Sequence, residues 1–267
     1  SLIFAPLSKR GDIAKLFAFN LEMASIKSKV TEPQIGYMRL QWWHDVIADI
    51  YQHGKTDKAH ETADNLSHLI NSYNIDKQFF FDYLEARKTD FEQYQFDNYE
   101  SLKNYLIGTA GNINKIMLAV LEVENPQNYH DIAENLAVAW GLTAIMRSSA
   151  ISFARAKYNI PTDIMNEYGM KPDRLGSQDF LNKSGKVFRL LSERSLEILD
   201  ICQEKIAAID SKTAKDIAPV LIQKRLTKYR NRQIAKNKYN LFKYQLLDYV
   251  GFFTLVRMMI GYKFSRY

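Results

Sequence analysis

Apolar residues recur at steps of three and four positions along most of this chain, the spacing that places them on one face of an α-helix. The first such run lies between Asp12 and Val30, and a second follows Pro33, a residue suited to the first turn of a helix. The same periodicity predicts further helices over residues 62–73, 76–95, 99–123, 129–157, 178–209, 213–228 and 239–264. Strand-like alternation is scarce, and no Asn-Gly or Asp-Gly hairpin signal occurs. The sequence therefore predicts an all-α protein.

Composition favours one helix-rich domain over residues 1–267. The chain contains only 11 Gly and 6 Pro and has no long low-complexity tract, so we expect no modules on flexible linkers. Its one cysteine, Cys202, cannot form an internal disulfide, and no Cys and His residues have the spacing of a zinc site. No segment has the pattern of a signal peptide, which favours a cytoplasmic protein.

A basic run without acidic residues lies between Gln223 and Lys238. Its cations are Lys224, Arg225, Lys228, Arg230, Arg232, Lys236 and Lys238. One interpretation is a solvated helix face. Another is a surface for an anionic membrane or a partner protein, because clustered cations feel the negative potential of a lipid leaflet. Nucleic acid is a weaker third interpretation, and we expect no such partner because no nucleic-acid-binding motif accompanies the charge.

The segment Val250–Ile260 is apolar, but we do not predict that it spans a membrane. Asp248 and Arg257 interrupt it, and a span needs roughly 20 mainly apolar residues. The segment predicts a buried core helix, whose Met and Phe side chains would also suit the wall of an apolar cavity.

Several short segments match, in the same order, the pattern of one enzyme family. They are Ala18-Phe19-Asn20-Leu21-Glu22, Glu32–Gly36, Arg39-Leu40-Gln41-Trp42-Trp43, Tyr99–Leu102 with Tyr105 and Ala110-Gly111, Leu142–Pro161, and Asp163–Gly169. Together they run from about residue 10 to residue 175, and the ordered set resembles the squalene/phytoene synthase family. The resemblance implies the all-α terpenoid synthase fold, a helical bundle around a deep central cavity.

Members of that family join two prenyl diphosphates, and Mg²⁺ held by acids on two facing helices neutralises the departing diphosphate. Two acids four residues apart share one helix face and can reach one metal ion. In this chain the acid positions fall on side chains without a carboxylate: Ala24, Ser25, Ser28, Ser148 and Ser152. A Gln and an Asn of the family fall on Gly141 and Ala144. The resemblance therefore implies the fold without its metal clamp, with no catalytic residue, no metal and no cofactor.

Three cations in the matched segments are candidates for binding an anionic ligand. Arg147 and Lys157 remain in the second clamp segment, and Arg39 precedes the paired tryptophans. For each of them a structural contact, such as an ion pair inside the bundle, is the alternative interpretation. Asp90 falls near an acid that the family often has, and we interpret it as structural because no second acid shares its face at metal spacing.

The residues in these segments resemble those of a divergent branch of the family, which includes a mitochondrial complex I assembly factor. The first hypothesis is thus a non-catalytic binding or assembly protein near the inner membrane, with a respiratory-complex protein as its client. The second is an active prenyl transferase that carries out the head-to-head condensation with Mg²⁺ and other acids. The third is a carrier of a prenyl or lipid ligand. The high Lys, Asn and Ile content is typical of an AT-rich bacterial genome.

Overall fold

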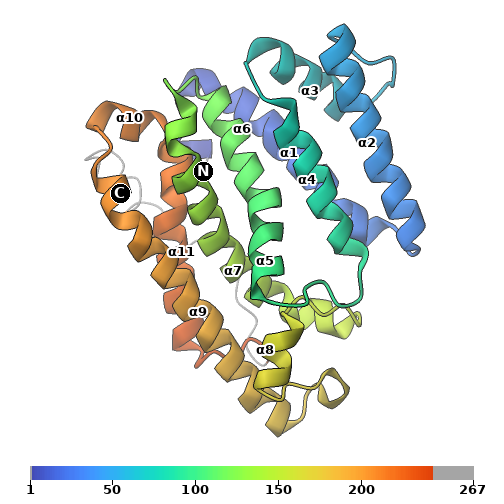
Figure 1. Cartoon of the computed structure of the whole chain (residues 1–267), viewed down its shortest axis with the longest axis vertical. Coiled ribbons are helices and arrows are strands. Elements are labelled where there is room, and N and C mark those ends of the chain that lie inside the picture. Colours follow the sequence, from blue (N-terminus) through green and yellow to red (C-terminus); the bar gives the residue numbers. More distant parts are fainter. Residues whose placement is uncertain (1, 243–267) are drawn as a thin grey trace.

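The computed structural model describes residues 2–242, which form the helical bundle of Figure 1. Its helices are α1 (Arg10–Lys29), α2 (Pro33–His53), α3 (Glu61–Ser72), α4 (Lys77–Arg87), α5 (Tyr99–Leu106), α6 (Asn112–Val120), α7 (His130–Ala154), α8 (Thr162–Glu167), α9 (Gln178–Ala207), α10 (Ser211–Asp216) and α11 (Ala218–Lys236). Within residues 2–242 there is no β-strand, only an isolated bridge between Tyr94 and Tyr158. The all-α class predicted from the periodicity is confirmed.

Local sequence signals fix several helix ends. Asn98 and Ser101 form a reciprocal capping box at the start of α5, and the Ser177 hydroxyl accepts a hydrogen bond from a backbone N–H in the first turn of α9. Asp210 caps α10 in the same way. Helix α2 ends at Gly54, whose φ of 74° is left-handed and carries no steric cost for glycine.

Helix α7 joins two apolar cores. Its first half, including Leu136, packs into the core formed by α1–α4 and α6. Its second half, including Leu142, packs into a core with α5, α8, α9 and α11. Figure 1 shows α2 and α3 at one flank and α9 to α11 at the other, with α6 and α7 between them. The segment Pro126–Ala154 is long and apolar enough to cross a membrane, but 56% of its most apolar window is buried, as expected for this core helix.

Three predicted helices differ from the observed ones. The helix predicted over 99–123 contains a π-helical turn at Ile107–Gly111, and the one over 76–95 ends at Arg87, followed by a 3₁₀ turn at Lys88–Phe91. The run predicted over 213–228 is two helices, because α11 begins anew near Pro219, and α11 continues to Lys236. Of the helix predicted over 239–264, including Val250–Ile260, residues 243–264 lie outside the described residues. The prediction of one domain over 1–267 remains a prediction.

Candidate functional site

A cavity of about 560 Å³ opens between α1, α6, α7 and α11. Helix α1 contributes Phe17, Asn20 and Lys27 to its wall, and α7 contributes a larger set. The α7 set consists of Trp140, Gly141, Ala144, Ile145, Arg147 and Ser148. Arg87, Tyr105, Leu106, Ile113, Asn114, Gln223 and Leu226 also line the cavity. Apolar surface and three cations thus share one hollow.

A buried polar network holds one wall of this cavity. The Arg87 guanidinium donates to the Tyr83 hydroxyl at 3.1 Å, to Asp90 Oδ2 at 3.1 Å and to the Asn20 amide oxygen at 3.3 Å. The Tyr105 hydroxyl donates to Asp90 Oδ1 at 2.8 Å. The side chains of Arg87 and Asp90 are only 11% and 4% exposed, so this pair is largely shielded from water. The network links α1, α4 and α5.

The electrostatics of the network favour a charged Arg87. Burial alone would lower the pKa of Arg87, but Tyr83, Tyr105 and Asp90 outweigh it and raise that pKa well above its usual range. Burial is also the main reason that the pKa values of Tyr83 and Tyr105 are raised, so both hydroxyls stay protonated and can donate.

Lys27 places a second cation beside this network. Its Nζ lies 3.5 Å from Asp90 Oδ1, and its side chain is 45% exposed, in contrast to buried Asp90. Because Lys27 also lines the cavity, its ammonium lies at the boundary between the cavity and solvent. Asp90 is therefore surrounded by Lys27, Arg87 and Tyr105, which agrees with the structural role predicted for it.

The structure brings part of the second clamp segment to the cavity. Ser148 lines it, and the Ser148 hydroxyl donates to the Ile145 carbonyl and accepts from the Asn159 amide at 2.9 Å. Gly141 also lines it, and a Cβ there would lie 2.5 Å from Leu106 Cδ2, so a larger residue would require the Leu106 side chain to shift. Ser152, one turn after Ser148, is half-buried near the end of α7 and is not among the lining residues.

The first clamp segment lies on α1 but is turned partly away from the cavity. Ala24 and Ser25 are half-buried and Ser28 is exposed, and none of these three is among the lining residues. The hydroxyls of Ser25 and Ser28 donate to backbone carbonyls of their own helix. Helices α1 and α7 both line the cavity, but of the five clamp positions only Ser148 does so, and Asn20 and Lys27 are the polar side chains that α1 presents to it.

The three predicted ligand cations separate in space. Arg147 lines the cavity. Arg39 is exposed on α2 and does not line it. Lys157 is half-buried, and its ammonium donates to the Phe91 carbonyl at 2.6 Å, which ties the loop after α7 to the turn that carries Asp90. Arg39 and Lys157 therefore do not line this cavity, and the binding of an anionic ligand by these two residues stays a prediction.

The basic run does not form one surface. Lys224 and Arg230 are 4% and 1% exposed because they lie on the face of α11 that packs into the bundle, so the prediction of a seven-residue surface is wrong for these two. The Arg230 guanidinium donates to the Gln233 side chain at 2.8 Å. The rest lie at intermediate or full exposure: Arg225, Lys228, Arg232, Lys236 and Lys238. Their use as a membrane or partner surface stays a prediction.

The residues present do not fit the family's Mg²⁺ ions. Mg²⁺ prefers several oxygen ligands, usually carboxylates, with phosphate and water. Within the described ranges no three His, Cys, Asp or Glu side chains cluster as metal ligands. Asp90, the carboxylate beside the cavity, already faces two cations. In this cavity the positive charge comes from Lys and Arg side chains, whereas in the family it is expected from Mg²⁺.

A helical bundle with one central cavity is the architecture of the terpenoid synthases, and solved structures of that class match this fold. A dehydrosqualene synthase in complex with ligand matches with a TM-score of 0.80 and 17% identity, over 98% of this chain and 88% of its own. The squalene synthase HpnC from Alicyclobacillus acidocaldarius matches with a TM-score of 0.64 and 13% identity, over 90% of this chain and 98% of its own. The fold is therefore that of a terpenoid synthase.

The sequence assigns the family within that class. The model of the squalene/phytoene synthase family matches residues 1–249, so the chain belongs to this family. The protein "NADH dehydrogenase (ubiquinone) complex I, assembly factor 6" is similar over 182 residues, with 26% identity in Bos taurus and 25% in Homo sapiens. In both cases the match covers 68% of this chain and 52% of the relative. Chloroplastic phytoene synthase 1 of Arabidopsis thaliana is 20% identical over 211 residues, 77% of this chain and 48% of the relative. The chain spans about half the length of these curated relatives.

Two functional parts of the cavity were missed by sequence reasoning. Lys27 lies in the first clamp segment but not at an aligned acid position, and Arg87 lies outside the matched segments. Neither residue was predicted to line the cavity. A helical projection of α1 could have found Lys27, because Asn20, Ala24 and Lys27 share one face at steps of four and three. Arg87 has no comparable signal, since its partners come from three different segments.

Proposed function

We propose that this protein is a non-catalytic member of its family that assists the assembly of a respiratory complex at the inner membrane, with a protein of that complex as its client. The similarity to complex I assembly factor 6 supports the assembly role. One observation supports the absence of prenyl transferase activity. Lys27, Arg87 and Tyr105 all contact Asp90, and the nearby clamp positions are Ala and Ser. None of these clamp positions has a carboxylate, and Asp90 is already paired with two cations, so this part of the cavity lacks a group that could hold a metal to offset the charge of a departing diphosphate.

Deletion of the gene in the organism that carries it tests the assembly role. We expect less fully assembled NADH dehydrogenase on native gels and lower NADH-dependent quinone reduction in membranes. A plasmid copy of the gene should restore both, and succinate dehydrogenase activity serves as the control for general membrane damage. Full levels of assembled NADH dehydrogenase in the deletion strain would contradict the proposal.

The cavity supports a second candidate, a carrier of a prenyl or lipid ligand with an anionic end. Its wall combines Lys27, Arg87 and Arg147 with apolar side chains such as Phe17 and Leu226. Cations beside apolar surface suit an amphiphile whose charged group lies at the Lys27 end. Such binding would need no metal, because the fixed cations provide the positive charge.

Trp140 lines the cavity and can report on this binding by its fluorescence. We expect farnesyl diphosphate to change the emission in the presence of EDTA, and Lys27→Gln to weaken the binding. Lys29→Gln is the matched control, because Lys29 lies on the same helix, pairs with Glu22 and does not line the cavity. Equal affinity for all three proteins, or a strict need for Mg²⁺, would overturn the carrier proposal.

A further inference from the structure

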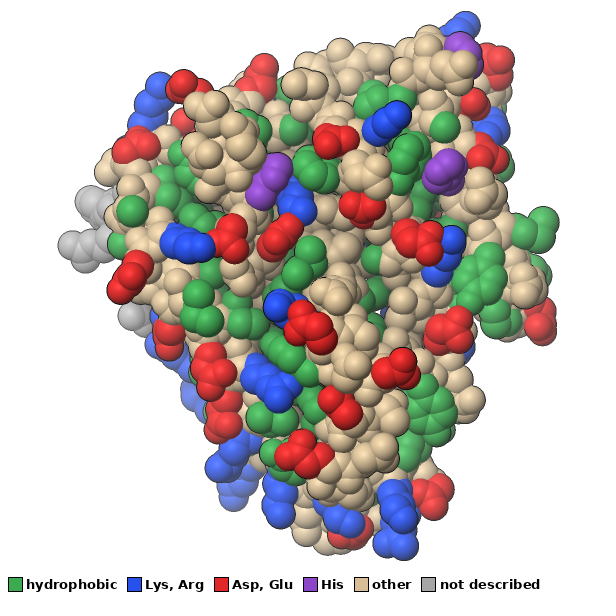
Figure 2. All heavy atoms as spheres, in the orientation of Figure 1, with side chains coloured by type: hydrophobic (Ala, Val, Ile, Leu, Met, Phe, Trp, Pro, Cys, Tyr) green, Lys and Arg blue, Asp and Glu red, His purple; other side chains and the backbone are tan. Residues whose placement is uncertain are grey.

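The first half of α2 exposes an apolar stripe at the flank of the described bundle. Ile35 and Met38 are 43% and 72% exposed, and Trp42, one turn after Met38, is half-buried. Steps of three and four residues place these three side chains on one face of the helix. The opposite face, which includes Leu40 and Trp43, packs into the core. Figure 2 shows hydrophobic side chains projecting at the right-hand edge of the molecule, the flank where Figure 1 places α2.

Trp42 is the fixed part of this stripe. Its ring lies edge-on to the Trp43 ring, with the two centroids 4.9 Å apart, and Lys58 Nζ lies 5.8 Å from the Trp42 ring centroid. Met38 beside it is exposed, and an unbranched Met side chain can adapt its shape to a partner. Aromatic residues and Met are enriched at protein–protein interfaces. The composition of the stripe is therefore that of a surface that binds another protein.

Two oppositely charged side chains flank the stripe. Arg39 and Asp45 are both exposed and lie six positions apart, about 9 Å along the helix. Among the described residues, no carboxylate pairs with Arg39, and no Lys or Arg pairs with Asp45, which lies 3.6 Å from the His44 ring. Asp49, one turn after Asp45, differs because a lysine pairs with it at 3.7 Å. The face thus offers one cation and one acid to charges on a partner.

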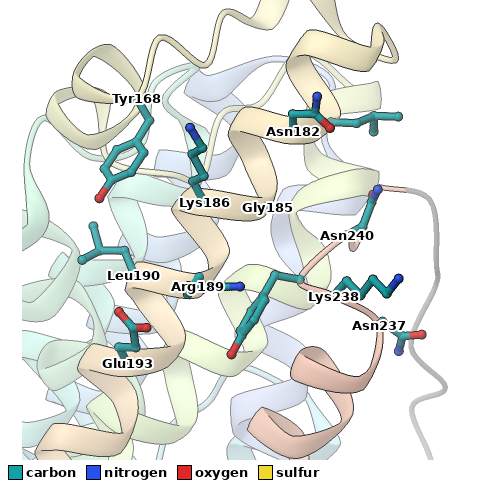
Figure 3. A pocket seen from close by; sticks show the side chains of 12 residues that line it. Tyr168, Asn182, Gly185, Lys186, Arg189, Leu190, Glu193, Asn237, Lys238 and Asn240 are labelled. Carbon is teal, nitrogen blue, oxygen red and sulfur yellow. The ribbon is translucent and has the colours of Figure 1, made fainter.

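The hollow at the other flank of the molecule offers no comparable surface. It has a volume of about 710 Å³ and lies between α9 and the turn that follows α11 (Figure 3). Lys186, Arg189 and Lys238 line it, but Figure 3 shows these three side chains pointing in different directions. They do not converge on one ligand group, so α9 is suited to serve as a control surface for α2.

We infer that the stripe on α2 docks an amphipathic helix of the client protein. Apolar side chains of that helix cover Met38 and Trp42, a carboxylate meets Arg39, and a Lys or Arg meets Asp45, because apolar anchors bind a helix and flanking charges fix its register. Each partner in a stable interface buries roughly 800 Å², more than three apolar side chains supply. The stripe therefore suits a client that is released after assembly, and not a stable pair of two copies of this chain.

This inference rests on the proposed assembly role and names the surface that serves it. Photo-crosslinking in cells tests the occupant, with p-benzoylphenylalanine in place of Met38 in the full chain. We expect an adduct whose second protein is a subunit of NADH dehydrogenase by mass spectrometry, linked through a helix that carries opposite charges about six residues apart. The control position is Ile201 on α9, which is 67% exposed and should yield at most about a tenth of this adduct. An adduct between two copies of this chain, equal adducts from both positions, or none from Met38 would overturn the inference.

A substitution in the stripe tests its use in assembly. In the deletion strain, a plasmid that carries Met38→Glu should give at least about tenfold less assembled NADH dehydrogenase than the wild-type plasmid, because a charge then lies at the centre of the contact. Ile201→Glu makes the same change at an exposed apolar residue of α9 and should restore assembly fully. Circular dichroism should show that both variants fold. Full assembly with Met38→Glu would overturn the docking surface and leave the assembly role intact, since the deletion strain tests that role separately.

Charge reversal tests the register of the partner helix. With p-benzoylphenylalanine at Met38, Arg39→Glu and Asp45→Arg should each lower the yield of the adduct by about threefold, because each sets like charges against each other. Asp173→Arg, at an exposed acid far along the chain, is the control and should leave the yield unchanged. Unchanged yields with both Arg39→Glu and Asp45→Arg would overturn the charge pattern assigned to the partner.

Discussion

Arg87 is the residue on which the cavity wall most depends. It donates to Tyr83, Asp90 and Asn20, and both it and Asp90 are nearly inaccessible to water. Removing Arg87 leaves the buried Asp90 carboxylate with only Tyr105 and the half-exposed Lys27 as partners, so we expect Arg87→Ala to lower the free energy of unfolding by about 3 kcal/mol. Urea unfolding measures this change.

A double variant provides the control for Arg87. In R87M/D90N the charge of both partners is removed together, so its loss of stability should be smaller than that of Arg87→Ala. A cost below about 1 kcal/mol for Arg87→Ala alone would show that the network does not support the fold.

Gly141 shows why the family's polar side chain cannot simply be restored. A Cβ at this position would lie 2.5 Å from Leu106, so Gly141→Gln should destabilise the protein by about 1–3 kcal/mol through overpacking. The second substitution Leu106→Ala makes room, and the double variant should lose less than the sum of the two single variants. Thermal unfolding of the four proteins measures the coupling, and strict additivity would contradict the packing argument.

Asp12 gives the stability a defined dependence on acid. Burial raises the pKa of Asp12, but hydrogen bonds from Tyr73 and Lys15 outweigh burial and hold that pKa below its ordinary value of 3.8. A lowered pKa in the folded state means that the contribution is complete above the ordinary value and is lost as the pH falls through the folded value. We expect Asp12→Asn to reduce the stability at neutral pH and to flatten its decline below about pH 4. Asp64→Asn, at an exposed site on α3, is the control, and an unchanged acid profile in Asp12→Asn would refute the assignment.

At the scale of helices, α7, α9 and α11 are held in register by a buried polar network. The Asn231 side chain accepts from Ser192 at 2.7 Å and donates to Ser195 at 3.0 Å, and Ser195 donates to the Ala139 carbonyl of α7. Asn231→Ala leaves buried hydroxyl groups without their partner, so we expect a loss of about 1–3 kcal/mol in urea unfolding. Asn237→Ala, at a half-buried position one residue after the end of α11, should cost less than about 1 kcal/mol. Similar costs for both variants would argue against the register role.

Helix positions followed from periodicity wherever one face packs on a core, as in α1, α2 and α9. Two of the three misses lie where one helix follows another without a loop, and the third is the end of α4 at Arg87, where a 3₁₀ turn follows. The apolar spacing is preserved on both sides of the π turn at Ile107–Gly111 and of the break between α10 and α11 at Ile217. Periodicity alone therefore predicts one continuous helix at each place. Pro219 was the available signal for the second break, since proline favours the first turn of a new helix.

At the scale of the whole molecule, the cavity was predictable from the family pattern but its electrostatics were not. Ser148, Arg147, Gly141 and Ala144 line it because they share one face of α7. Besides Arg147, its cations are Lys27 and Arg87 at the end of α4, and the assembly of these two with Asp90 from distant segments has no local signature. The prediction that the basic run forms one surface was wrong for a related reason. One face of α11 packs into the bundle, and this face buries Lys224 and Arg230.

Consumption of a prenyl diphosphate tests the central claim most directly. The purified protein is incubated with farnesyl or geranylgeranyl diphosphate and Mg²⁺, and the remaining substrate is measured by mass spectrometry, with a matched incubation in EDTA. Since the clamp positions carry no acids and Asp90 is held by Lys27 and Arg87, we expect equal substrate recovery in both incubations. Turnover in Mg²⁺ that is abolished by EDTA would contradict the account and would identify a working synthase.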